Sequence, residues 1–250
     1  MSASTLPGTP PAPRTPTAGN KGNKGNKGNK GNKGNNLTGF TLTHDLIRRA
    51  VPELGRRLAN AASGGAPDPA AVARLITWWG MFTTILDGHH TSEDSHVWPV
   101  VLAADPALET VSRTLEEQHA SLDGHLAGIH EGLRLLRDNP GSHEPGLSHL
   151  LARIAEFDAL MYDHLQLEER TMVPVLRDQV TGEAYAAMLA SLASGHDPAD
   201  FVPTMPLLLE QAPQQAREFM LGGMPAELRT RYEQEWEPAY FELLATLPAA

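Results

Sequence analysis

The sequence predicts an all-α protein built around an up-down four-helix bundle, with a C-terminal helical extension and a disordered N-terminal tail. Two observations carry this prediction. Apolar residues recur every three or four positions over four long segments, which is the period of an amphipathic helix. The connections between these segments are short and rich in Gly and Pro, which favours antiparallel packing of successive helices.

The first predicted helix carries an apolar stripe from Ile47 to Leu58, with His44 at its head. We expect Thr43 to be its N-cap and Pro52 to kink it. The same periodicity predicts three further helices, over residues 69–102, 106–137 and 145–179. The four helices together define a bundle over residues 41–179.

Residues 1–40 are expected to form the disordered tail, because a Pro/Thr/Ser-rich start and repeated Lys-Gly-Asn triplets cannot bury enough apolar surface to fold. An electrostatic tether to an anionic surface is the functional alternative to a dispensable N-terminus. Residues 1–36 hold six cationic side chains and no acid, so the net charge of −10 becomes −16 for the remainder. A body this acidic is not expected to bind nucleic acid, which requires a basic surface.

Residues 180–250 are cut by prolines into short helices, and we expect them to pack on the bundle as an extension. The chain has no cysteine, which excludes disulfides and thiolate metal sites. It shows no signal-peptide pattern and no apolar stretch of membrane-spanning length. These features predict a cytoplasmic protein without a membrane partner.

Polar residues interrupt the apolar stripes of the predicted helices at regular places. Side chains four positions apart lie on one helix face, and three helices each carry a histidine followed four residues later by a carboxylate. The first helix adds a lone histidine on its stripe. The seven candidate metal ligands are therefore His44, His89, Glu93, His119, Asp123, His164 and Glu168.

A second pair of this spacing, His90 and Asp94, competes with His89 and Glu93 on the second helix. Counted at 100° per residue, Glu93 lies inside the apolar arc, whereas His90 and Asp94 lie outside it. We therefore expect His90 and Asp94 to flank the site or to support its ligands.

Seven polar groups at interior positions would be costly to bury without partners. One or two divalent cations remove that cost, and imidazole with carboxylate suits iron, manganese or zinc. Four histidines and three carboxylates exceed the needs of one ion but match two ions, with Glu93 and Glu168 as bridges. The residues thus predict a buried site for two metal ions.

An ordered set of motifs resembles the hemerythrin-like, or HHE cation-binding, family over residues 41–177. The order is a lone histidine, a His-x-x-x-Glu pair, a further histidine and a second His-x-x-x-Glu pair. The matching segments are His44–Arg49, His89–Pro99, Glu117–His119 and His164–Glu169. This resemblance implies a non-haem di-iron centre that binds oxygen, nitric oxide or peroxide.

Two departures from the oxygen-carrying members of that family bear on function. The carriers have a histidine where this chain has Asp123, and they close with His-x-x-x-x-Asp where this chain has His164 and Glu168. A carboxylate in place of an imidazole favours ferric iron. We therefore expect sensing, storage or redox protection rather than stable oxygen carriage, and a sensor would also need a protein partner.

Two other functions stay open on the sequence alone. A di-iron peroxidase or oxidase would use the same site but would need a substrate channel and an open coordination position. A metal-free regulatory helical module would use the histidines as a pH-sensitive polar core. Peroxide turnover and metal analysis, respectively, would discriminate these functions from the first.

Overall fold

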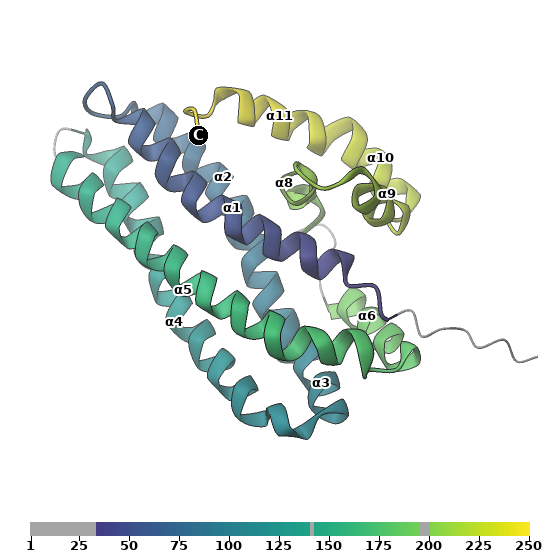
Figure 1. Ribbon diagram of the computed structural model, residues 1–250. Coiled ribbons are helices and arrows are strands. Elements are labelled where there is room, and N and C mark those ends of the chain that lie inside the picture. Colours follow the sequence, from purple (N-terminus) through teal and green to yellow (C-terminus); the bar gives the residue numbers. More distant parts are fainter. Residues whose placement is uncertain (1–33, 141–142, 196–200) are drawn as a thin grey trace, which may run out of the picture. The chain divides into compact units, whose positions relative to one another are not determined.

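The computed structural model describes residues 34–140, 143–195 and 201–250. Within this part every regular element is a helix or helical turn, and four long helices form the bundle that the sequence predicts (Figure 1). Of residues 1–40, which were expected to be disordered, residues 1–33 lie outside the described part, whereas residues 38–40 are helical, so the expectation is wrong for that stretch. The long helices are α1 (Thr38–Ala61), α2 (Pro69–Ser92), α4 (Glu109–Asp138) and α5 (His143–Asp178).

The bundle is a closed ring of four helices. Helix α1 packs against α2 and α5, and α4 packs against the same two neighbours. Every long helix therefore turns a wide face inward, which allows side chains from all four to meet at the centre.

Helix α1 begins earlier than the sequence suggested. Thr43 lies inside the helix, where its hydroxyl donates to the carbonyl oxygen of Gly39, so it is not the N-cap. The side-chain oxygen of Asn36 instead accepts from the N–H of Thr38 at 2.9 Å. Asn35 ties the segment before α1 to the end of α5, because its side-chain amide donates to the carbonyl oxygens of Leu176 in α5 and of Val180, two residues after that helix.

The second predicted helix is divided by a π-helical turn. Asp68 caps α2 by accepting from the N–H of Ala70, and Pro69 occupies the first turn, where the predicted helix begins. The chain then passes through the π turn η1 (Glu93–Val97) into α3 (Trp98–Ala104). A π turn accommodates one more residue than an α turn and so changes the direction in which the side chains of α3 face. A 3-10 turn, η2 (Pro106–Leu108), leads into α4.

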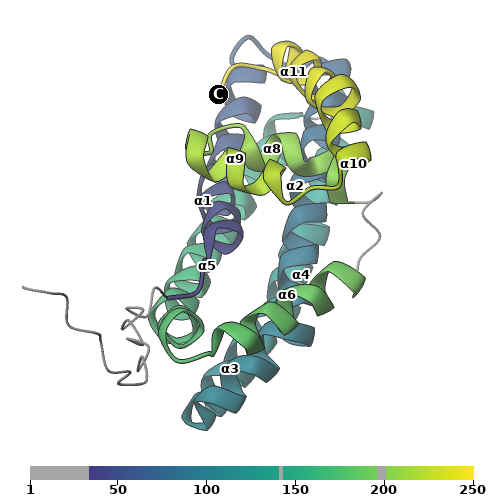
Figure 2. The same cartoon turned by 90° about the vertical axis from the view of Figure 1, so that its right-hand side faces the viewer.

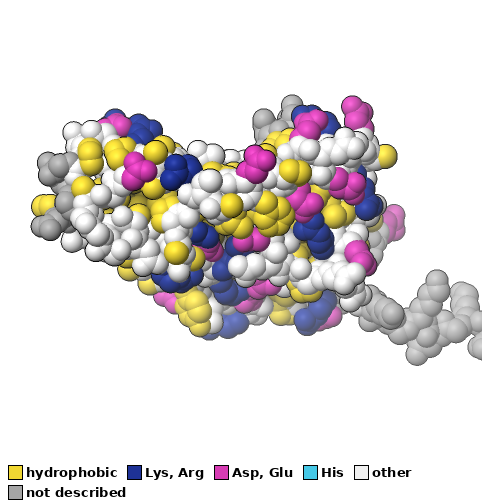
Figure 3. All heavy atoms as spheres, turned by 90° about the horizontal axis from the view of Figure 1, so that it is seen from above, with side chains coloured by type: hydrophobic (Ala, Val, Ile, Leu, Met, Phe, Trp, Pro, Cys, Tyr) yellow, Lys and Arg dark blue, Asp and Glu magenta, His cyan; other side chains and the backbone are white. Residues whose placement is uncertain are grey.

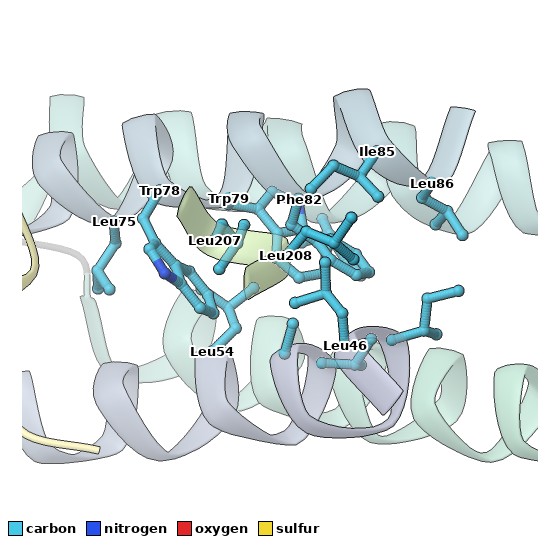
Figure 4. Packing of buried hydrophobic residues seen from close by; sticks show 14 of the residues in the cluster. Leu46, Leu54, Leu75, Trp78, Trp79, Phe82, Ile85, Leu86, Leu207 and Leu208 are labelled. Carbon is cyan, nitrogen blue, oxygen red and sulfur yellow. The ribbon is translucent and has the colours of Figure 1, made fainter. Parts of the chain in front are cut away.

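The C-terminal extension lies against α1 and α2 (Figure 2), and its apolar side chains belong to the main core. Leu207 and Leu208 insert between apolar side chains of α1 and α2, among them Leu54, Trp78 and Phe82 (Figure 4). The elements of the C-terminal extension are α6 (Gly182–Gly195), η4 (Val202–Thr204), α8 (Met205–Leu209), α9 (Gln214–Gly222), α10 (Ala226–Arg231), the π turn η5 (Tyr232–Trp236) and α11 (Glu237–Thr246).

Ion pairs and hydrogen bonds hold the extension to α1. Arg49 of α1 lies 2.9 Å from the carboxylate of Glu210, and Tyr240 of α11 donates to the same carboxylate at 2.8 Å.

Within α1 itself, the buried guanidinium of Arg57 contacts the buried carboxylate of Glu53. Basic, acidic and apolar side chains lie side by side on the face shown in Figure 3.

The apolar interior consists of two clusters separated by a polar layer. Along α4 and α5, the buried residues of one cluster stop several positions before those of the other begin. On α4 the change falls between Leu115 and Leu122, and on α5 it falls between Leu165 and Met172. Among the described helices, none combines the length and apolar composition needed to cross a membrane. The polar layer between the clusters is where the candidate site lies.

Candidate metal centre

The polar layer brings five histidines and two glutamates together at the middle of the bundle. Their ligand atoms form three overlapping groups, within each of which all ligand atoms lie within 4.8 Å of one another. Helix α1 supplies one of these side chains, α2 two, the π turn one, α4 one and α5 two. The residues are His44, His89, His90, Glu93, His119, His164 and Glu168.

Two of the groups share both glutamates. One group joins His44 and His89 to Glu93 and Glu168, and the other joins His119 and His164 to the same carboxylates. The third group stacks His90 onto the second, with its ring 4.1 Å from that of His119. The layer is therefore divided into two halves, and the glutamates lie between them.

Glu93 directs one carboxylate oxygen toward each half. Its Oε1 lies 3.5 Å from Nε2 of His89 in the first half. Its Oε2 lies 3.7 Å from Nε2 of His119 in the second half.

Glu168 is arranged in the same way. Its Oε2 lies 3.4 Å from Nε2 of His44, and its Oε1 lies 2.8 Å from Nε2 of His164. A carboxylate whose two oxygens face two sets of imidazoles has the geometry to bridge two cations.

Three of the histidines are held from outside the layer through their other ring nitrogen. Nδ1 of His44 lies 2.9 Å from the carboxylate of Glu169, and Nδ1 of His119 lies 3.1 Å from that of Asp94. Nδ1 of His164 lies 2.9 Å from the amide oxygen of Gln118. A hydrogen bond from Nδ1–H leaves the lone pair on Nε2, which is the nitrogen that faces the layer in each case.

Burial keeps two of the imidazoles neutral. Desolvation, with the neighbouring His44 as the next contribution, lowers the pKa of His89 to about 3. Desolvation and the neighbouring His119 lower the pKa of His90 to about 2. Neutral imidazoles are the form that binds a metal ion.

The pKa values of the two glutamates are shifted in opposite directions. Desolvation raises the pKa of Glu93 well above its ordinary value, and repulsion from Glu168 raises it further. Burial would also raise the pKa of Glu168, but favourable contacts with His119 and His164 outweigh burial and hold that pKa well below its ordinary value. Without a cation, ionisation of Glu93 beside the charged carboxylate of Glu168 is therefore unfavourable.

Buried ligand atoms without a hydrogen-bond partner test whether the layer fits metal ions. Seven atoms of the layer lack such a partner within the described part of the chain. Buried polar atoms are nearly always satisfied, so this concentration calls for an explanation. Cations between the halves would satisfy all seven together. The atoms are Nε2 of His44, His89 and His90 and both carboxylate oxygens of Glu93 and Glu168.

The structure brings together six of the seven residues that the sequence nominated and leaves out the seventh. Asp123 is exposed on α4 and belongs to none of the three groups. The expectation that it lies on the buried face is therefore wrong. It lies one position beyond the buried Leu122, on the solvent side of α4.

His90 is the residue that the sequence analysis missed. It was expected to flank the site, but its side chain is buried and stacked on His119. That expectation assumed a single inward arc on α2, whereas α2 packs against both α1 and α4. His89 therefore faces one neighbour and His90 faces the other. Two adjacent histidines on a helix packed on two sides were the pattern that could have shown this. Asp94 supports a histidine, as expected.

The fold and the layer together define a class of protein: an all-α, four-helix metal-binding domain with a histidine and carboxylate donor set. A family model described as the hemerythrin HHE cation binding domain matches residues 36–176, more than half of the chain. The chain therefore belongs to the hemerythrin HHE cation-binding family. Comparisons with curated proteins and with solved structures gave no match.

Proposed function

We propose that this protein holds two iron ions in the polar layer and uses them to bind oxygen, nitric oxide or peroxide, for sensing, storage or redox protection. The observation that carries the proposal is the position of Glu93 and Glu168, each with one carboxylate oxygen toward each half of the layer. A single cation would need only one half. The two-sided arrangement supports a pair of ions.

The donor chemistry favours iron, with manganese or zinc as the alternatives. Imidazole and carboxylate donors suit all three metals. With both glutamates shared, the seven donors could be distributed as four on the side of His44 and five on the side of His119. When bound, a pair of iron ions supplies reversible redox chemistry and coordination of small ligands. The side with fewer protein donors is where we propose that an external ligand binds.

Phe40 gives that side an apolar boundary. Its ring centroid lies 4.1 Å from that of His44 and 5.6 Å from that of His89. An apolar wall limits the entry of water and charged solutes, and so favours small neutral ligands. This arrangement supports the choice of diatomic gases or peroxide over larger substrates.

The exposed position of Asp123 removes one of the two departures behind the sequence-based case against oxygen carriage, and the departure at Glu168 remains. That case assumed that a carboxylate replaces an imidazole among the ligands, whereas the layer offers five imidazoles and two carboxylates. Reversible binding of oxygen therefore stays within the proposal. We also propose that the protein is cytoplasmic and that, if it is a sensor, it has a protein partner.

Metal analysis of the purified protein, with absorbance spectra in the presence and absence of oxygen, tests the proposal. We expect two iron ions per chain and a visible absorption band that responds to oxygen, nitric oxide or peroxide. Steady consumption of hydrogen peroxide would instead favour the enzymatic alternative. Protein that takes up no iron, manganese or zinc would overturn the proposal and favour the metal-free regulatory module.

A further inference from the structure

The three outer partners of the layer's histidines differ in charge. His164 has the neutral amide of Gln118, and His119 has the carboxylate of Asp94. His44 has the carboxylate of Glu169, which in turn contacts a cation, Arg48. Among the described residues, only this partner forms an ion pair of its own with an arginine. On the side of the layer with fewer donors, a histidine is therefore linked through a carboxylate to an arginine.

The geometry of this group follows from helix periodicity on α1 and α5. Arg48 lies one helical turn after His44, so both side chains project from the same side of α1. Glu169 follows Glu168 on α5, and its carboxylate faces both His44 and Arg48. Its Oε1 lies 2.9 Å from Nδ1 of His44, and its Oε2 accepts from Arg48 at 2.8 Å.

Exposure separates the pair from the buried layer. The side chains of Arg48 and Glu169 are 31% and 37% exposed, whereas those of His44 and Glu168 are 1% and 0% exposed. The pair can therefore be altered without opening the core. Its charge still acts on His44 through a direct hydrogen bond, which solvent screens far less than a distant interaction.

We propose that Glu169 and Arg48 are positioning residues that set the affinity and the reduction potential of the metal ion beside His44. The Glu169 carboxylate accepts the Nδ1–H of His44, which fixes the lone pair on Nε2 and makes that nitrogen a stronger donor. Arg48 moderates the effect because its positive charge draws electron density from the same carboxylate. The inference rests on the metal binding proposed above.

Two single variants should have effects of opposite sign. Glu169→Gln keeps a hydrogen-bond acceptor but removes the negative charge, so His44 becomes a weaker donor. We expect metal affinity to fall by about tenfold or more and the reduction potential to rise. Arg48→Met leaves the carboxylate without its cation, so His44 becomes a stronger donor. We expect metal affinity to increase and the potential to fall.

The experiment compares the full-length protein with both variants, the double variant, and two matched controls. The controls are Glu156→Gln and Arg113→Met, exposed residues on α5 and α4. Three quantities are measured: metal per chain, affinity for ferrous iron in competition with a chelator, and reduction potential by spectroelectrochemistry. Circular dichroism of the metal-free forms verifies folding, and Glu169→Asp provides a charge-retaining variant if Glu169→Gln folds poorly.

Each outcome bears on a separate claim. Shifts of opposite sign in the two single variants, with an intermediate double variant and silent controls, support the inference. Shifts in the same direction, or shifts no larger than those of the controls, overturn it while the proposed function stands. A wild-type protein that binds no metal overturns both.

Discussion

Glu93, from a π-helical turn, and Glu168, from α5, meet at the centre of the histidine layer. In each carboxylate one oxygen faces the first half of the layer and the other oxygen faces the second half. The two carboxylates would repel one another without a cation between the halves. The structure shows this cost in the pKa of Glu93, which burial and Glu168 raise. The protein therefore keeps an arrangement that is unfavourable for stability and suited to metal binding.

Replacement of Glu93 should separate stability from metal binding. We expect Glu93→Gln to stabilise the metal-free protein by on the order of 1–2 kcal/mol, because it removes a buried carboxylate whose charge is disfavoured. The same change should reduce metal content, because one bridge between the halves is lost. Urea denaturation and elemental analysis measure the two effects. A variant that is less stable and fully metal-loaded would contradict this account.

His90 and Asp123 distinguish the tertiary structure from the angular positions counted on the sequence. We expect His90→Ala to lower metal content or affinity, because His90 belongs to the cluster with His119 and His164. Asp123→Asn should leave both unchanged, because Asp123 is exposed. Metal titration of the two variants beside wild type provides the measurement. Equal losses in both would show that Asp123 reaches the site in solution.

Acid should destabilise the metal-free protein over a defined range. The pKa values of His89 and His90 are lowered to about 3 and about 2, from 6.5 in the unfolded chain. Between pH 6.5 and about 3 the unfolded chain therefore binds more protons, so the free energy of unfolding falls as pH falls. Each histidine contributes up to about 1.4 kcal/mol per pH unit.

Two other histidines modify the acid response. The pKa of His44 is also lowered, by burial. Burial would lower the pKa of His119 as well, but the carboxylates of Glu168 and Asp94 outweigh burial and raise it. His119 and Glu93, whose pKa is also raised, therefore offset part of the loss. Urea midpoints of the metal-free protein at pH 7, 6 and 5 measure the net effect. A midpoint that does not move over this range would refute the prediction.

The extension should contribute to the stability of the bundle. Leu207 is fully buried between side chains of α1 and α2 (Figure 4). We expect Leu207→Ala to cost about 2–5 kcal/mol, the usual range for a cavity of this size. Leu160→Ala is the control, because Leu160 is 40% exposed on α5. If thermal unfolding gave equal small losses for both variants, the extension would be only loosely attached.

The sequence by itself determined the helical class and most of the site. His44, His119 and His164 stand on apolar stripes, and Glu93 and Glu168 follow histidines by one helical turn. These relations are local, because the 3.6-residue period fixes which side chains share a face of a single helix. Local periodicity was therefore sufficient to nominate six residues that meet at the centre of the bundle.

Only the tertiary structure decided which faces were inside. His90 is buried because α2 has neighbours on two sides, and Asp123 is exposed because the inward arc of α4 ends before it. The Glu169–Arg48 pair joins α5 to α1 across more than one hundred residues of chain. Such contacts depend on how helices are placed around one another. A periodic pattern within one helix contains no information about that placement.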